Sequence, residues 1–222
     1  MLPISGFLFD IDGTLIDSND AHAKAWDQTF RENGIEVPFA EIRASIGMGG
    51  DHLLPKLASV EKDSSIGKQM EQRRGEIFRE TYLPTLNSFS KSRELLQTLR
   101  AKAYVVGVAT SASAKDLKSL LKQTGLEDSF DTKTNSSDVR RSKPEPDVIE
   151  AALEKIAVDS RRTAMVGDTP YDIEAATRAG VRTIGLTCGG WSKQALKEAG
   201  AWKVYADPAE LLDAVITGRA LS

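Results

Sequence analysis

The sequence predicts an α/β protein, with a doubly wound parallel sheet and a helical cap domain inserted after the first strand. Short apolar runs rich in β-branched or aromatic residues alternate with longer amphipathic stretches, a pattern typical of parallel βαβ units. Polar residues follow most of these runs, at the strand ends where α/β proteins place their sites. The alternation is interrupted once, because residues 17–82 show only helical patterns.

Five apolar runs are expected to form the strands of the sheet. They are Ile4–Phe9, Tyr104–Ala109, Thr163–Val166, Val181–Leu186 and Lys203–Tyr205. The amphipathic stretches between and after them predict core helices at Ser92–Lys102, Ala114–Thr124, Asp147–Ile156, Tyr171–Ala179 and Ala209–Ile216. These helices should cover both faces of the sheet.

The interruption predicts a second, smaller unit made only of helices. Its expected helices are Ala21–Asn33, Phe39–Ser45, Gly50–Leu57 and Ser65–Tyr82. Because the insert follows the first strand, it should lie above the carboxyl end of that strand and act as a lid. We expect its hinges near Leu15–Ser18 and Leu83–Asn87, where small polar residues and Pro84 break the helical pattern.

Composition limits the classes of protein that fit. The chain has 222 residues, enough for one or two domains with a sizeable core. A net charge of −3 argues against general nucleic-acid binding, and the single Cys188 excludes an intrachain disulfide. No signal-peptide pattern and no membrane-length apolar stretch is present. We expect a cytoplasmic monomer or weak homodimer with a small-molecule partner and no nucleic-acid or membrane partner.

The first predicted strand leads into two carboxylates, Asp10 and Asp12. Side chains two residues apart on an extended chain point the same way, so the two acids would repel unless a cation or a shared proton lay between them. Mg²⁺ takes oxygen ligands of this kind. A turn or a helix cap is an equally good explanation of the pair taken alone.

Similar polar residues follow the later strands. The hydroxyls of Thr110 and Ser111 can either bind a phosphate or cap a helix. Lys143, which precedes a proline, is either a cation that binds phosphate or an exposed surface lysine. Asp168 follows the next strand, and Asp172 falls in the opening turn of a helix, where a carboxylate also suits the helix dipole. Together, these residues place carboxylates, hydroxyls and a lysine at one edge of one sheet.

The ordered set of motifs resembles the haloacid dehalogenase superfamily of phosphatases. It reads Asp10-x-Asp12-Gly-Thr-Leu, then Thr110, then Lys143-Pro, then Gly167-Asp168-x-x-x-Asp172, and it covers residues 4 to about 212. The position of the insert resembles the helical-cap subgroup, which includes phosphoglycolate phosphatase-like and β-phosphoglucomutase-like enzymes. The resemblance implies a Rossmann-like catalytic core of residues 1–16 and 85–222 and a cap of residues 17–84.

The resemblance also implies a role for each motif residue. Asp10 would be the nucleophile that forms an aspartyl-phosphate, and Asp12 the acid and base. Thr110, Ser111 and Lys143 would bind the phosphoryl group. Mg²⁺ would be held by Asp10, Asp168 and the backbone carbonyl of Asp12, and Asp172 would support this site without binding the ion. The expected reaction is hydrolysis of a small phosphorylated metabolite of the sugar phosphate or phosphoglycolate type.

Cap residues are expected to select the substrate. His22 is either a substrate contact, as in the β-phosphoglucomutase branch that this stretch resembles, or an ordinary histidine on the helix surface. We expect Trp26 to lie in the core of the cap. Gly49 lies in a glycine-rich loop that can approach a substrate closely. Because that loop lacks arginine, although Arg43 is near, a mutase is the alternative rather than the first choice. Lys56 is a further candidate contact, and a non-catalytic phospho-ligand-binding module is the second alternative.

Overall fold

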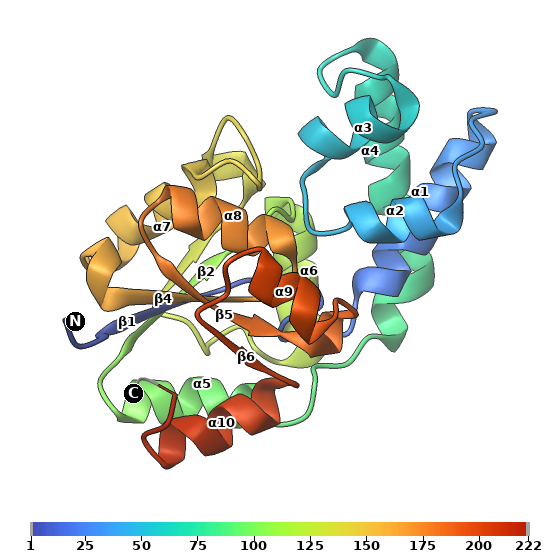
Figure 1. Ribbon diagram of the computed structural model, residues 1–222. Coiled ribbons are helices and arrows are strands. Elements are labelled where there is room, and N and C mark those ends of the chain that lie inside the picture. The colour runs from blue at the N-terminus through green and yellow to red at the C-terminus, as the bar shows by residue number, and fades with distance from the viewer. Residues whose placement is uncertain (1, 221–222) are drawn as a thin grey trace.

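The computed structural model describes residues 2–220, which form a parallel sheet, flanking helices and a helical insert (Figure 1). Six strands pair in the order β3-β2-β1-β4-β5-β6, all parallel. Their bounds are β1 Gly6–Phe9, β2 Val105–Ala109, β3 Thr132–Thr134, β4 Thr163–Gly167, β5 Arg182–Leu186 and β6 Lys203–Tyr205. Because β1 lies between β2 and β4, residues that follow these three strands meet at one edge of the sheet.

Helices cover both faces of the sheet, as the alternation predicted. Helices α5 (Ser92–Ala101), α6 (Ala114–Thr124) and α10 (Pro208–Ile216) pack on one face, and α7 (Asp147–Ile156) and α8 (Pro170–Arg178) on the other (Figure 1). Strand β1 shows why: Phe7 and Phe9 belong to the first cluster and Leu8 to the second, because successive side chains alternate between faces. The short α9 (Lys193–Glu198) packs beside α8.

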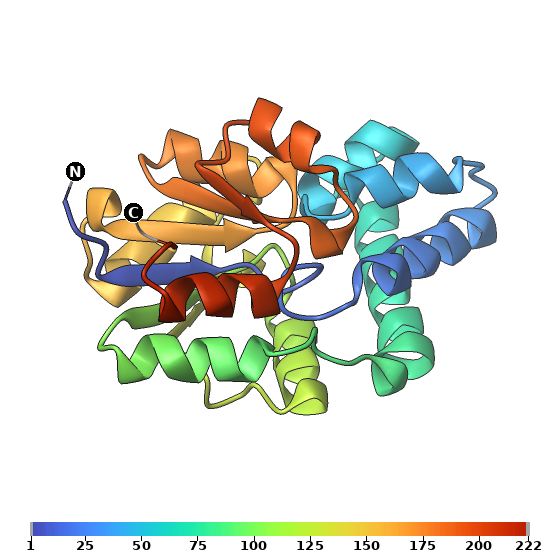
Figure 2. The same ribbon diagram turned by 60° about the horizontal axis from the view of Figure 1, so that its bottom comes forward.

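Residues 17–84, called the helical insert below, build a separate hydrophobic cluster. Its helices are α1 (Asn19–Glu32), α2 (Phe39–Ser45), α3 (Gly50–Ala58) and α4 (Ser65–Ile77), and α4 continues into a π-helical turn, η1 (Phe78–Tyr82). The cluster includes Trp26, Phe30, Ile42, Leu53 and Met70. Figures 1 and 2 show these helices beyond the end of the sheet toward which the strand arrows point.

The two connections between insert and core run side by side. The Asp17 N–H donates to the Asn87 carbonyl at 3.2 Å, and the Phe89 N–H donates to the Leu15 carbonyl at 2.9 Å. Ile16 and Ser88 form an antiparallel bridge between them. The predicted hinges are therefore paired with each other, while hinge motion and a domain division at residues 16/17 and 84/85 stay predictions.

Two core elements were not predicted from the sequence. Strand β3 has only three residues, two of them threonine, and pairs with β2 alone at the edge of the sheet, so it carries little apolar signal. Helix α9 has six residues. Short 3₁₀ turns complete the chain: η2 Leu83–Thr85, η3 Ser136–Asp138, η4 Ser160–Arg162 and η5 Thr187–Gly189.

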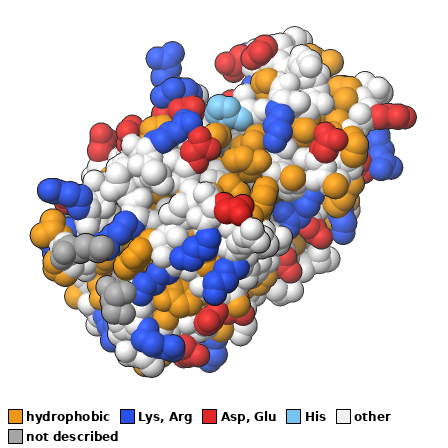
Figure 3. All heavy atoms as spheres, viewed as in Figure 1, with side chains coloured by type: hydrophobic (Ala, Val, Ile, Leu, Met, Phe, Trp, Pro, Cys, Tyr) orange, Lys and Arg blue, Asp and Glu red, His pale blue; other side chains and the backbone are white. Residues whose placement is uncertain are grey.

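The surface mixes charges of both signs. On the face shown in Figure 3, basic and acidic side chains are interspersed among small hydrophobic groups, in keeping with the net charge of −3. Within residues 2–220, every helix is too short or too polar to cross a membrane.

Candidate active site

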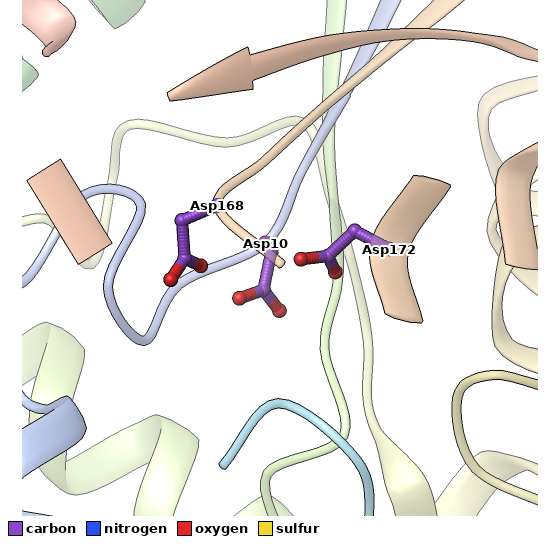
Figure 4. A group of neighbouring side chains, drawn as sticks. All are labelled: Asp10, Asp168 and Asp172. Carbon is purple, nitrogen blue, oxygen red and sulfur yellow. The ribbon is translucent and has the colours of Figure 1, made fainter. Parts of the chain in front are cut away.

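Three carboxylates meet at the carboxyl edge of the sheet. Asp10 directly follows β1, Asp168 follows β4, and Asp172 lies in the first turn of α8. Strands β1 and β4 are adjacent and parallel, so the residues that follow them lie side by side. One oxygen of each carboxylate lies within 4.8 Å of the others, and Figure 4 shows the three groups turned toward one another. The structure thus brings together three of the predicted site residues.

The Lys143 ammonium joins two of these carboxylates. Its Nζ lies 2.7 Å from Asp10 Oδ1 and 2.6 Å from Asp172 Oδ1, and its side chain is fully buried. Burial alone would lower the pKa of Lys143, but Asp10 and Asp172 outweigh burial and hold that pKa above its ordinary value. Lys143 is therefore charged, and it offsets part of the negative charge around Asp10.

Hydrogen bonds hold the Asp172 and Asp168 carboxylates in place. Asp172 Oδ2 accepts from the Thr169 N–H at 3.0 Å and the Thr169 hydroxyl at 2.7 Å, in a capping box that also begins α8. Asp168 accepts from Thr14 Oγ1 at 3.0 Å and from Asn19 Nδ2 at 2.9 Å. Because Asn19 is the first residue of α1, this bond connects the helical insert to Asp168.

The acidic cluster holds more negative charge than Lys143 balances. Burial raises the pKa of Asp10 to about 7; Lys143 opposes this shift, and Asp172 and Asp12 add to it. Burial, Asp172 and Asp10 also raise the pKa of Asp168 well above its ordinary value. A hard divalent cation would compensate this charge, and three buried carboxylates with oxygens this close fit Mg²⁺.

The Asp12 carboxylate is not part of this cluster and pairs with the insert instead. Asp12 Oδ1 accepts from the Ser18 hydroxyl and lies 2.8 Å from His22 Nε2. The His22 ring stacks on Phe78, with 3.9 Å between ring centroids. Burial acts to raise the pKa of Asp12, but His22, Ser18 and the more distant Arg74 outweigh it and lower that pKa. Ring stacking and the hydrogen bond together fix the histidine beside the acid.

A cavity of about 290 Å³ lies between the sheet edge and the helical insert. Asp10 and Asp12 line it from the end of β1, and Thr110 and Ser111 from the loop after β2. Thr110 Oγ1 accepts from the Ala112 N–H at 3.1 Å, whereas Ser111 Oγ has no hydrogen-bond partner among residues 2–220. Thr110 and Ser111, the predicted phosphate-binding residues, therefore line the same cavity as Asp10.

The predicted residues of the insert divide into two groups. His22, Trp26 and Gly49 line the cavity. Lys56 does not: its Nζ lies 5.9 Å from the centre of the Tyr171 ring, on the outer contact between insert and core. Arg43 also binds elsewhere, donating to Asp20 and, at 2.6 Å, to the Gly189 carbonyl.

The predicted core residues divide in the same way. The cavity reaches Asp10, Asp12, Thr110 and Ser111 but not Lys143, Asp168 or Asp172, each of which is completely buried. In this conformation, Lys143 contacts carboxylates rather than the space where a phosphoryl group would bind.

The glycine-rich loop of the insert rests on the core loops that carry the site. Asp51 Oδ2 accepts from the Ser142 N–H at 2.8 Å, one residue before Lys143. A Cβ at Gly49 would lie only 2.3 Å from the Ser142 Cβ, and one at Gly47, where φ is +110°, would lie 2.7 Å from a methyl carbon of Thr169. The close approach therefore requires glycine.

Sequence reasoning missed three charged residues that line the cavity. They are Lys62, Glu71 and Arg74, from the insert. One signal was available for Arg74: it shares a helix face with Met70 and Ile77, four residues before and three after, and both are buried. A charged residue within an apolar helix face needs a polar partner, but that partner lies far away in the sequence.

Cys188 is half-buried beside the acidic cluster, with Sγ 3.3 Å from the Gly13 carbonyl oxygen. Burial, with Asp168 and Asp207 adding to it, raises the pKa of Cys188 to about 12. Cys188 is therefore a protonated thiol at neutral pH, and not a nucleophile.

Comparison with known proteins identifies the family. The model of the haloacid dehalogenase-like hydrolases matches residues 7–186. The chain belongs to this family. It is 32% identical over 198 residues to the probable phosphatase IndB of Dickeya dadantii, covering 86% of this chain and 85% of that one. It is 30% identical over 217 residues to a phosphoglycolate phosphatase of Yersinia pestis, covering 96% and 93%.

A solved structure agrees closely with this fold. A hydrolase from Pseudomonas syringae superposes with a TM-score of 0.90 at 28% sequence identity, covering 96% of this chain and 98% of that one. Family and relatives together make the chain a phosphatase-type hydrolase. The resemblance read from the motifs and the α/β class are thereby confirmed.

Proposed function

We propose that the protein is a Mg²⁺-dependent phosphatase that hydrolyses a small phosphorylated metabolite through an aspartyl-phosphate on Asp10. The observation that carries the proposal is the position of Asp10. Its carboxylate lines the cavity, while Lys143 contacts it at 2.7 Å and Asp168 and Asp172 lie close by. A carboxylate in this position can attack a phosphoryl group bound in the cavity, while Lys143 offsets its negative charge from the opposite side.

Asp10 and Asp168 would hold the metal ion, together with the Asp12 backbone carbonyl, and Asp172 would keep Lys143 in place. When bound, Mg²⁺ supplies positive charge that lowers the repulsion between the carboxylates and a phosphate dianion. Lys143 supplies the same kind of compensation from the chain itself, since its ammonium lies between Asp10 and Asp172. Thr110 and Ser111 would donate their hydroxyl protons to phosphoryl oxygens.

The first step joins an Asp10 oxygen to phosphorus and breaks the bond between phosphorus and the ester oxygen. The leaving oxygen then needs a proton. Asp12 and His22, 2.8 Å apart, can hold one proton between them, and both line the cavity. In the second step, Asp12 takes a proton from water, the water oxygen attacks phosphorus, and the bond to Asp10 breaks to release phosphate. The net reaction is hydrolysis of the ester.

The helical insert acts as the lid in this proposal. It closes the cavity through Asp51 on the core loop at Ser142 and through Asn19 on Asp168. Excluding bulk water protects the acyl phosphate until the deprotonated water attacks. Opening of the insert would admit the substrate, so the paired connections at residues 15–18 and 83–89 would carry the motion.

A β-phosphoglucomutase-like mutase is the alternative. It would require a cation on the insert to hold a second phosphate, and Lys62 and Arg74 do line the cavity. Arg74, however, is already paired with Asp116 and Glu71. Because these carboxylates already balance its charge, Arg74 is poorly suited to hold a second phosphate, which favours hydrolysis of a monophosphate. An assay with a hexose bisphosphate separates the two activities.

The test is phosphate release from a panel of hexose phosphates, pentose phosphates, phosphoglycolate and acetyl phosphate. We expect release with Mg²⁺, none with a chelator, and none from Asp10→Asn under either condition. A Cys188→Ala variant is the matched control, because Cys188 lies beside the cluster but takes no part in the reaction. Release from Asp10→Asn at the wild-type rate would refute the proposal; no release from any compound by the wild type would favour a mutase or a binding module.

A further inference from the structure

A buried ionic cluster connects the cavity wall to the core outside the acidic site. Asp116 lies in the first turn of α6, and its side chain is 1% exposed. Its Oδ2 accepts from Arg74 Nη1 at 2.9 Å, and its Oδ1 from Arg79 Nη1 at 2.6 Å. Both arginines belong to the helical insert, on α4 and on η1, so one core carboxylate holds two side chains of the insert.

The backbone explains how both arginines reach the same carboxylate. Residues five apart on a regular α-helix point about 140° away from each other. Arg74 and Arg79 flank the junction of α4 with the π-helical turn η1, whose wider i→i+5 winding brings residues five apart closer to one face. The N-terminal turn of α6, capped by Ser113, favours the negative charge of Asp116.

Arg74 extends from this cluster to the cavity. Its guanidinium carbon lies 5.6 Å from the centre of the Trp26 ring, and both residues line the cavity. Its Nη2 lies 3.4 Å from Glu71 Oε2, and its Nε, although buried, has no hydrogen-bond partner among the described residues. Arg74 thus has donor capacity that the chain itself does not use.

The cost of burial indicates a role beyond stability. Removing charged groups from water costs several kcal/mol for each ion, and well-packed apolar residues often stabilise a protein as well or better. Asp116 and Arg74 are buried, and Arg79 is partly buried, at the contact between the insert and the core. In some proteins, buried ionic groups of this kind fix a defined geometry.

We propose that Asp116 is a positioning residue, which holds Arg74 over Trp26 so that Arg74 donates to an oxygen of the leaving group of the substrate. Arg79 shares the carboxylate and fixes its rotation. The leaving-group end of the cavity is then completed only when the helical insert is seated on α6. This inference rests on the proposed phosphatase function for its substrate, but the placement of Arg74 by Asp116 can be tested without any substrate.

The key variant is Asp116→Asn, which keeps the shape of the side chain and removes its charge. The matched control is Tyr171→Phe, because the Tyr171 hydroxyl donates to the Ala44 carbonyl at 2.7 Å and thus also joins core to insert, away from the cavity. The substrate-free measurement is acrylamide quenching of Trp26 fluorescence in a Trp191→Phe, Trp202→Phe background, with circular dichroism to check folding. We expect quenching of Trp26 to rise at least twofold in Asp116→Asn and to stay unchanged in Tyr171→Phe.

The kinetic measurement compares two phosphorylated compounds that differ in the leaving group. They are acetyl phosphate and the hexose phosphate that the wild type hydrolyses fastest. We expect Asp116→Asn to lower kcat/KM for the hexose phosphate about tenfold more than for acetyl phosphate, chiefly through KM, because a charged hydrogen bond to the longer leaving group is lost.

Each outcome decides one part of the inference. Equal quenching of Trp26 in Asp116→Asn and wild type overturns the positioning role, whether or not the protein is a phosphatase. Increased quenching with an unchanged ratio of the two kcat/KM values overturns the contact between Arg74 and the leaving group. If the wild type releases phosphate from no compound at all, the proposed function fails, and the quenching result still decides the role of Asp116.

Discussion

Replacing Lys143 with methionine removes the cation that contacts Asp10 and Asp172 in the acidic cluster. In the folded protein, the Lys143 ammonium lies 2.7 Å from Asp10 and 2.6 Å from Asp172, with no exposure to solvent. The variant leaves both carboxylates buried without a counter-charge, and breaking a buried ion pair costs about 3–5 kcal/mol. Since a domain is stable by about 5–15 kcal/mol, we expect the variant to lose about a fifth of its free energy of unfolding or more.

The loss should depend on pH in a defined direction. The pKa of folded Asp10 is already raised from its ordinary value of 3.8 to about 7, mainly by burial. The folded state therefore binds this proton more tightly than the unfolded state, and its contribution to stability falls as pH rises from about 4 to about 7. Without Lys143 the pKa rises further, so the deficit of the variant should be large at pH 8 and smaller at pH 5.

Urea unfolding in the presence of a chelator measures this effect. Lys56→Met is the control: the Lys56 ammonium only approaches the Tyr171 ring, at 5.9 Å, and its loss should change the free energy of unfolding by no more than about 1 kcal/mol. Equal effects of the two substitutions, or a Lys143→Met deficit that is the same at pH 5 and pH 8, would refute the reasoning.

Three further predictions concern the same site. Mg²⁺ should raise the melting temperature more at pH 8 than at pH 5, where Asp10 and Asp168 retain protons because their pKa values are raised; an equal rise at both pH values would contradict this. Asn19→Ala should weaken Mg²⁺ binding about 10–100-fold by calorimetry, because Asp168 loses a hydrogen bond, whereas Asn33→Ala at the other end of α1 should not. Asp12→Asn should lower kcat about 10²–10⁴-fold while the free energy of unfolding stays within about 1 kcal/mol; unchanged turnover would remove the acid and base role.

Most of the sheet was predictable because its central strands are continuous apolar runs. Strands β1, β2, β4 and β5 are buried on both faces, and such strands differ clearly in composition from the amphipathic helices between them. Strand β3 escaped because an edge strand of three residues gains its identity from pairing with β2, not from its own sequence. The same argument applies to the six-residue α9.

The acidic cluster of the candidate site was predictable from position along the chain. Asp10 and Asp168 directly follow adjacent parallel strands, so the topology alone brings them together, and the motif order added Lys143 and Asp172. Tertiary contacts across the cavity were not predictable in this way. Asn19 binds Asp168, which lies 149 positions away in the sequence. Asp116 binds Arg74 and Arg79, which lie 42 and 37 positions away. No local pattern indicates such pairs.

The most direct test of the account is to look for the phosphoryl group on Asp10. The Asp12→Asn variant is mixed with Mg²⁺ and acetyl phosphate, whose acetate leaving group needs no proton from Asp12, quenched in acid within the first turnover, digested and analysed by mass spectrometry. We predict a phosphoryl adduct on the peptide that carries Asp10, located at Asp10 itself and absent when a chelator is added. Phosphate release without any adduct, or an adduct on a different residue, would contradict the central claim.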